Sequence, residues 1–127
     1  MTKIGFITTN KVLGQSLSSA INSKPNLGFE PFILLNLDQA ALDVEVLQID
    51  VAVIDILDSV STQNTSVLSV CKKIRRASPS CRLLLFLSQD DIRGKATAVA
   101  AVQGEIADDF VFYDTSLEYF FAKLSAF

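Results

Sequence analysis

Side chains able to do chemistry lie at the ends of the apolar segments of this sequence. Asp55 and Ser88 each stand near the end of such a segment, Thr8 ends the first one and Thr9 follows it, and Tyr113 ends the last. A carboxylate can bind a hard cation, and it can also accept hydrogen bonds from hydroxyl groups. The sequence has no histidine, so the usual metal ligand, the usual general base and a Ser-His-Asp arrangement are excluded.

Five short apolar runs are typical of buried strands and predict where these side chains lie. The runs are Lys3 to Thr8, Phe29 to Leu35, Asp50 to Leu57, Arg82 to Ser88 and Asp109 to Tyr113. The third and fourth are continuous in Val, Ile, Leu and Phe, which indicates strands buried on both faces of a parallel sheet. Right-handed crossovers then favour a doubly wound α/β fold, in which function is expected beyond the carboxyl ends of the strands.

The segments between these runs have helical spacing and predict five helices. The first ends before Pro25, and the others cover Asp38 to Gln48, Ser66 to Ala77, Asp91 to Gln103 and Ser116 to Ala126. In the second helix we expect Ala41, Leu42, Val46 and Val44 to face inward. Asn10 or Thr9 is expected to cap the first helix and Ser116 the last.

Three parts of the chain resemble the receiver domain of response regulators, in the order found in that family. Residues 50–57 resemble its third strand, which ends in the phosphoacceptor aspartate, here Asp55. Residues 72–88 resemble its third helix and fourth strand, and residues 107–110 and 116–118 resemble its fifth strand and the start of its last helix. The resemblance covers nearly the whole chain, so we expect one domain over 1–127, a flavodoxin-like topology and strand order 2-1-3-4-5.

The resemblance also implies a reaction site from which several groups are missing. Asp55 matches the phosphoacceptor and Ser88 the hydroxyl position, but Thr8 and Thr9 stand where receivers carry a metal-binding acidic pair. Tyr113 stands at the position of the receiver lysine. Without magnesium and lysine, negative charge on the acceptor has no compensation. We therefore expect a vestigial Asp55, hydrogen-bonded by Thr8, Thr9 or Ser88, with no metal, no cofactor and no enzymatic activity.

The expected function is that of a pseudo-receiver, a signalling domain that works through protein contacts and independently of phosphorylation. The expected setting is a two-component-type or transcription regulatory system. Phe110 matches the switch aromatic of the family. The expected partners are an output domain, a kinase, another regulator or a second copy of the chain, bound on the face built by the fourth helix, the fifth strand and the fifth helix.

Two alternatives remain open from the sequence. One is a working receiver that is phosphorylated on Asp55 and uses an unconventional metal site, with oxygens from Asp58, Asp90 or Asp91. The other is a module that binds a small phosphate- or flavin-type ligand at residues 8–10, where the amides of a helix N-terminus favour an anion.

Composition excludes other classes of function. The 127 residues carry a net charge of −3, which disfavours direct binding of nucleic acid. We interpret the basic run at 72–76 as a solvated helix face. The apolar runs are too short to span a bilayer, and the first residues lack a secretory signal, so a cytoplasmic protein without membrane contact is expected. Cys71 and Cys81 are expected to be reduced packing residues.

Overall fold

Five parallel strands form one sheet in the computed structural model, which describes residues 1–56 and 65–127. The strands are β1 (Thr2–Ile7), β2 (Phe29–Leu34), β3 (Val51–Asp55), β4 (Arg82–Leu87) and β5 (Asp109–Phe112). Their order is β2-β1-β3-β4-β5, and every neighbouring pair is parallel. The predicted α/β class, the parallel sheet and the strand order are confirmed.

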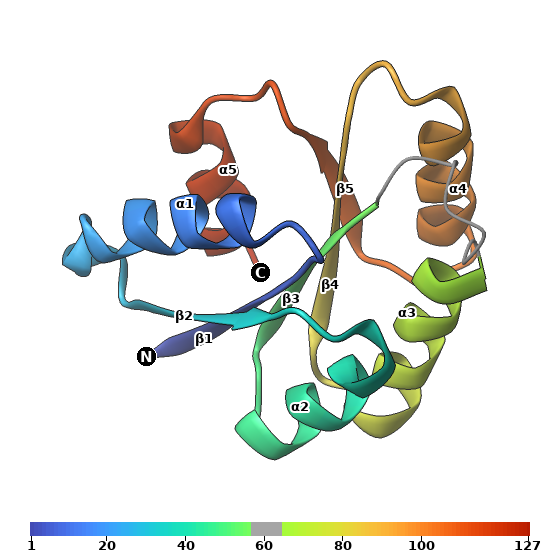
Figure 1. Ribbon diagram of the computed structural model, residues 1–127, viewed down its shortest axis with the longest axis horizontal. Coiled ribbons are helices and arrows are strands. Elements are labelled where there is room, and N and C mark those ends of the chain that lie inside the picture. Colours follow the sequence, from blue (N-terminus) through green and yellow to red (C-terminus); the bar gives the residue numbers. More distant parts are fainter. Residues whose placement is uncertain (57–64) are drawn as a thin grey trace.

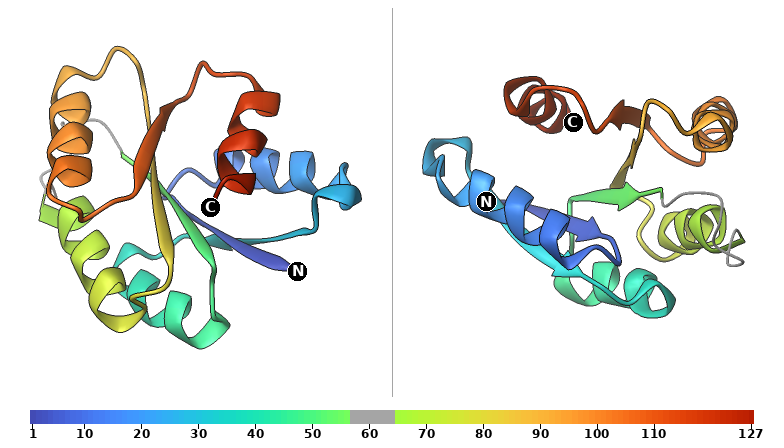
Figure 2. Two further views of the ribbon diagram at one scale, coloured as in Figure 1. Left: turned by 180° about the vertical axis from the view of Figure 1, so that it is seen from behind. Right: turned by 45° about the horizontal axis from the view of Figure 1, so that its top comes forward.

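Five α-helices cover the two faces of this sheet, as predicted. They are α1 (Lys11–Asn22), α2 (Ala40–Leu47), α3 (Thr65–Ala77), α4 (Ile92–Gln103) and α5 (Leu117–Ser125). Two short 3-10 turns, η1 (Pro25–Leu27) and η2 (Leu37–Gln39), precede β2 and α2. Helices α1 and α5 lie on one face, and α2, α3 and α4 lie on the other (Figures 1 and 2). Helices α1, α4 and α5 are capped by side-chain oxygens that accept hydrogen bonds from backbone amides, those of Asn10, Asp91 and Ser116 respectively.

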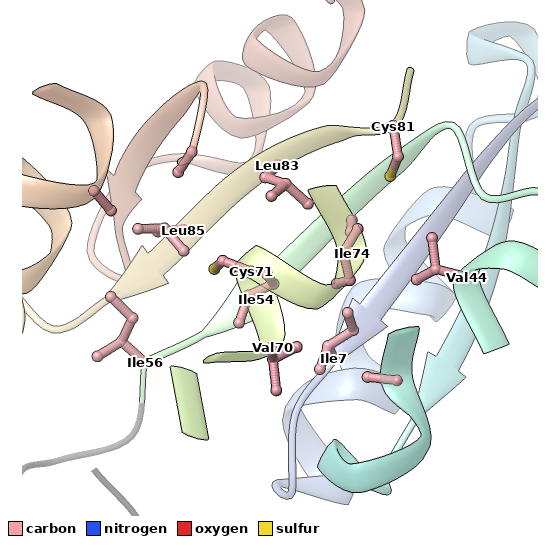
Figure 3. Packing of buried hydrophobic residues seen from close by; sticks show 14 of the residues in the cluster. Ile7, Val44, Ile54, Ile56, Val70, Cys71, Ile74, Cys81, Leu83 and Leu85 are labelled. Atoms are coloured by element: carbon pink, nitrogen blue, oxygen red, sulfur yellow. The ribbon is translucent and has the colours of Figure 1, made fainter. Parts of the chain in front are cut away.

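The sheet separates two apolar cores, each of which fixes the helices on its own face. The core under α2, α3 and α4 includes Val44, Ile74 and Leu85, which converge from a helix on one side and the sheet on the other (Figure 3). The core under α1 and α5 is richer in aromatic rings and includes Phe6, Phe86 and Phe120. Because the central strands are covered on both faces, the residues at their carboxyl ends are held in fixed positions.

Both cysteines lie in the first of these cores and are not paired with each other. Burial raises the pKa of the Cys71 thiol to about 12 and that of Cys81 to about 11. Both are therefore protonated near neutral pH and serve as packing residues, as the sequence predicted.

The predicted inner face of α2 was wrong in part. Leu42 and Val46 are 59% and 69% exposed, whereas Ala40 and Val44 are fully buried. Helix α2 is apolar on more than one side, so helical spacing alone defines two competing stripes. The stripe with the small Ala40 faces the core, which agrees with the close packing of α2 beside α3.

Part of the basic run in α3 has a structural role. The Arg75 guanidinium donates hydrogen bonds to the backbone oxygens of Cys81 and Ile106, and it lies 3.0 Å from the carboxylate of Asp108. Asp108 also accepts a 2.8 Å hydrogen bond from the amide of Leu83. Arg75 thus ties the start of β4 to the segment that enters β5, while Lys72, Lys73 and Arg76 are exposed, as expected for a solvated face.

No helix within the described residues is long and apolar enough to cross a membrane.

Candidate functional site

Asp55 and Thr8 meet at the carboxyl edge of the sheet because their strands are neighbours. Asp55 is the last residue of β3, and Thr8 directly follows β1, whose Ile7 pairs with Ile54. The Thr8 hydroxyl donates a 2.8 Å hydrogen bond to Oδ2 of Asp55 and accepts a 2.9 Å hydrogen bond from the amide of Asn10. The Asn10 amide therefore orients the Thr8 hydroxyl so that its proton points at the carboxylate.

Tyr113 contacts the other oxygen of the same carboxylate. Its hydroxyl donates a hydrogen bond to Oδ1 of Asp55 from the residue that follows β5. Two interactions place the tyrosine: its amide donates to the backbone oxygen of Leu87 at 2.9 Å, and its ring packs edge-on against Phe86 with centroids 4.6 Å apart. Both carboxylate oxygens thus have a neutral hydroxyl donor.

Asp55 is a buried acid, and its hydrogen-bonding partners among the described residues carry no charge. It is 5% exposed and Thr8 is 3% exposed. Burial raises the pKa of the Asp55 carboxyl, and the hydrogen bond from Thr8 opposes this effect to a smaller extent. Within residues 1–56 and 65–127, the ion pairs use Asp108 and Asp109 and none includes Asp55. The carboxylate of Asp55 is therefore stabilised by hydroxyl dipoles, and none of the cations in these ion pairs contacts it.

The other residues predicted for the site are less closely involved. The hydroxyl of Ser88 accepts a 3.2 Å hydrogen bond from the amide of Asp90, and Thr9 is exposed. Of the three hydroxyl donors expected for Asp55, the structure brings Thr8 into contact with it.

Phe110 is half-buried on β5, where the centroid of its ring lies 5.7 Å from that of Phe112 and the two ring planes are 72° apart.

The described residues do not fit a bound divalent cation at Asp55. They contain no group of three or more acids or thiols that could hold a metal. Asp91, one of the acids considered as a substitute ligand, uses its carboxylate to cap α4 through the amide of Gly94 at 2.8 Å. Asp90 is exposed, and Asp58 lies outside the described part of the chain. A magnesium ion would also have to displace the hydroxyl protons that now point at both oxygens of Asp55.

The loop at residues 8–10 offers little to a phosphate-type ligand. The Thr8 hydroxyl and the Asn10 side chain are both engaged within the chain, the latter with the amide of Leu13. An open hollow of about 400 Å³ adjoins the loop, but its lining includes Asp38 beside Thr9 and Asn36. A carboxylate in this position repels an anionic ligand.

The hydrogen bond from Tyr113 to Asp55 was not predicted. The sequence did indicate that a tyrosine stands at the lysine position of the receiver pattern. The reach of its side chain across β4 to Asp55 depends on strand placement, which the sequence pattern does not provide.

Comparison with solved structures identifies the fold. A two-component response regulator from Clostridium difficile superposes with a TM-score of 0.77 at 22% identity, over 99% of this chain and 94% of the other. A response regulator from Burkholderia pseudomallei, described with a phosphorylated aspartic acid and a calcium ion, gives 0.74 at 20% identity, over 99% and 72%. A structure described as an adenylate cyclase from Rhodopirellula baltica gives 0.81 at 16% identity, over 99% and 87%.

Sequence comparison adds no closer assignment: no family model matches the chain, and no curated protein matches it. The solved structures confirm the resemblance to receivers at the level of the fold, including the flavodoxin-like strand order.

Proposed function

We propose that this chain, which has the fold of response-regulator receivers, is a pseudo-receiver that signals by binding other proteins and without phosphorylation of Asp55. The observation that carries the proposal is the pair of hydrogen bonds from Thr8 and Tyr113 to the two oxygens of Asp55. In an active receiver, this edge of the sheet would hold a magnesium ion and a lysine beside the acceptor.

Charge balance argues against phosphoryl transfer at this edge. A phosphorylated carboxylate carries a largely dianionic phosphoryl group, and its formation requires cations that neutralise the phosphoryl oxygens. Within the described residues, the side chains that donate hydrogen bonds to Asp55 are a threonine and a tyrosine, which supply neutral dipoles instead. Burial already disfavours a single negative charge on Asp55, as its raised pKa indicates. A dianionic group in the same place would be disfavoured more strongly.

Accessibility supports the same proposal. Attack on a phosphodonor requires a free carboxylate oxygen in line with the leaving group. Oδ1 is covered by the Tyr113 hydroxyl, Oδ2 accepts from Thr8, and Asp55 as a whole is 5% exposed. Tyr113 would have to move before any donor reached the carboxylate.

We propose that the surface for protein partners is formed by α4, β5 and α5. Ile92 at the start of α4 is 81% exposed, and Leu117 and Tyr119 on α5 are each 49% exposed. Phe120 and Phe121 are buried in the core, and Phe127 lines a hollow at the amino ends of the strands, so these three rings are not part of this surface. We propose that an output domain, a kinase, another regulator or a second copy of the chain binds here.

The direct test is incubation of the purified chain with magnesium and acetyl phosphate, followed by intact-mass measurement. The expected result is that incubation leaves the mass of the wild-type chain unchanged, as it leaves that of Asp55→Asn, which cannot form the acyl phosphate. A phosphoryl adduct on the wild-type chain that is absent from Asp55→Asn would overturn the proposal. It would favour the alternative of a working receiver. Magnesium titration by calorimetry on the same two proteins provides an independent readout, and no heat of binding is expected.

A further inference from the structure

Tyr113 lies between the acidic edge of the sheet and the aromatic core beneath α5. Its hydroxyl contacts Asp55, while its ring packs edge-on against Phe86 of β4 at 4.6 Å and 82°. Phe86 in turn stacks on Phe120 of α5, with centroids 5.3 Å apart and ring planes 24° apart. An unbroken series of contacts therefore runs from the carboxylate of Asp55 to the buried side of α5.

Phe120 is a central residue in the attachment of α5. It is 2% exposed and its ring also lies 6.4 Å from Phe6 of β1 and 6.0 Å from Phe121 of the same helix. Aromatic pairs with tilted or offset geometry at these separations add to the free energy of burial. A change in the position of Phe86 would thus be felt by the side of α5 that faces the sheet.

Tyr113 is also placed to respond to a partner, because it is 38% exposed. The turn that leads from it into α5 is short: Thr115 donates to the backbone oxygen of Phe112 at 3.2 Å, and Ser116 caps the helix. Exposed Leu117 follows directly. A protein that covered Leu117 would therefore contact the same short segment that holds Tyr113 on Asp55.

We propose that the hydrogen bond between Tyr113 and Asp55 is a conformational device that couples the acidic edge of the sheet to the packing of α5 through Phe86 and Phe120. When the bond is made, the ring of Tyr113 holds Phe86 against Phe120 and α5 is firmly attached. When it is broken, the segment between β5 and α5 loosens and α5 opens more often. The proposal rests on the proposed function, since it treats Asp55 as an unmodified acceptor of hydrogen bonds.

Amide hydrogen exchange followed by NMR tests this coupling in the full chain. Tyr113→Phe removes the hydroxyl and keeps the ring. We expect exchange of the Phe120, Phe121 and Leu124 amides to accelerate about tenfold, as for loss of one hydrogen bond to a carboxylate. Amides of α3, on the opposite face, should keep their rates. A uniform change over all helices would indicate a loss of global stability and would contradict the proposal, as would unchanged rates in α5.

Two further variants make the test specific. Tyr119→Phe removes the same hydroxyl from the other tyrosine of the chain, which is exposed on α5, and should leave the exchange rates of Phe120 and Leu124 within about twofold of wild type. Asp55→Ala removes the acceptor. If both residues act through one contact, adding Tyr113→Phe to Asp55→Ala should accelerate exchange in α5 no further. Additive effects would overturn the proposal.

These outcomes are distinguishable from a failure of the proposed function. Phosphoryl labelling of Asp55 would end the pseudo-receiver assignment, whatever the exchange rates. Unchanged exchange in Tyr113→Phe would end the coupling proposal even if Asp55 takes no label.

Discussion

The hydroxyl of Thr8 lies 2.8 Å from Oδ2 of Asp55, at the carboxyl ends of two neighbouring parallel strands, although the two residues are 47 positions apart in the chain. In the receiver pattern this position belongs to an acid that holds a metal ion. Here the side chain donates a hydrogen bond directly to the carboxylate that such an ion would bind. A hydrogen bond thus stands where the receiver pattern has an ion.

Thr8→Val keeps the shape of the side chain and removes its hydroxyl. Because a buried carboxylate would lose one of its two hydroxyl donors, we expect the free energy of unfolding to fall by about 1–3 kcal/mol. Urea denaturation near neutral pH measures this change. The matched control is Thr9→Val, at an exposed neighbour, for which a change within about 0.5 kcal/mol is expected. Equal effects of the two substitutions would argue against a stabilising role for the Thr8 hydrogen bond.

Asp55→Asn should change how stability depends on pH. Since burial raises the pKa of Asp55 in the folded chain, the unfolded chain ionises first as the pH rises above about 4. Folding therefore loses stability with rising pH until the folded pKa is passed. Asparagine has no such loss, so the stability of Asp55→Asn relative to wild type should increase over this pH window.

Urea denaturation at a series of pH values measures that difference. Asp108 contributes equally in both proteins, so the comparison cancels its effect. Burial raises the pKa of Asp108, but the Leu83 amide and the guanidinium of Arg75 outweigh burial and lower it. Asp108 acts with the opposite sign, because its contribution is lost as the pH falls through its folded pKa. A difference between the two proteins that does not vary with pH would show that Asp55 titrates normally.

Restoring the receiver groups should restore the chemistry. The triple variant Thr8→Asp, Thr9→Asp, Tyr113→Lys supplies an acidic pair and a cation beside Asp55. We expect it to bind magnesium and to gain the mass of a phosphoryl group from acetyl phosphate. Both gains should be lost when Asp55→Asn is added to the triple variant, and labelling should also be lost when the magnesium is chelated. Without magnesium it should be less stable than wild type, because clustered carboxylates repel. A stable, folded triple variant that neither binds magnesium nor takes label would mean that the fold prevents the reaction by another route.

Arg75→Met should lower the free energy of unfolding by about 2–3 kcal/mol, because the partly buried backbone oxygens of Ile106 and Cys81 and the carboxylate of Asp108 each lose a charged donor. Urea denaturation measures the loss. Arg76→Met is the control, since Arg76 is the exposed neighbour in the same basic run, and a change within about 0.5 kcal/mol is expected. Similar losses in both variants would place Arg75 among the solvated residues.

The sequence alone determined the architecture of the sheet. Runs such as Asp50 to Leu57 and Arg82 to Ser88 are apolar without alternation, and only strands covered on both faces have a use for that pattern. The alternation of such strands with helical segments left few topologies to consider. The same reasoning brought Asp55, Thr8 and Tyr113 to one edge, because the carboxyl ends of parallel strands lie together.

Tertiary structure decided which of those side chains touch. Asp55 and Tyr113 are 58 positions apart and lie at the ends of strands separated by β4, so their contact depends on sheet twist and on the reach of a phenol ring supported by Phe86. Helix α2 shows the same limit, because helical spacing cannot choose between the stripes of Val44 and Val46 when both are apolar. Packing against α3 and the sheet makes that choice. Periodicity records which residues can be buried, while contacts between distant segments depend on distances that exist only after the chain has folded.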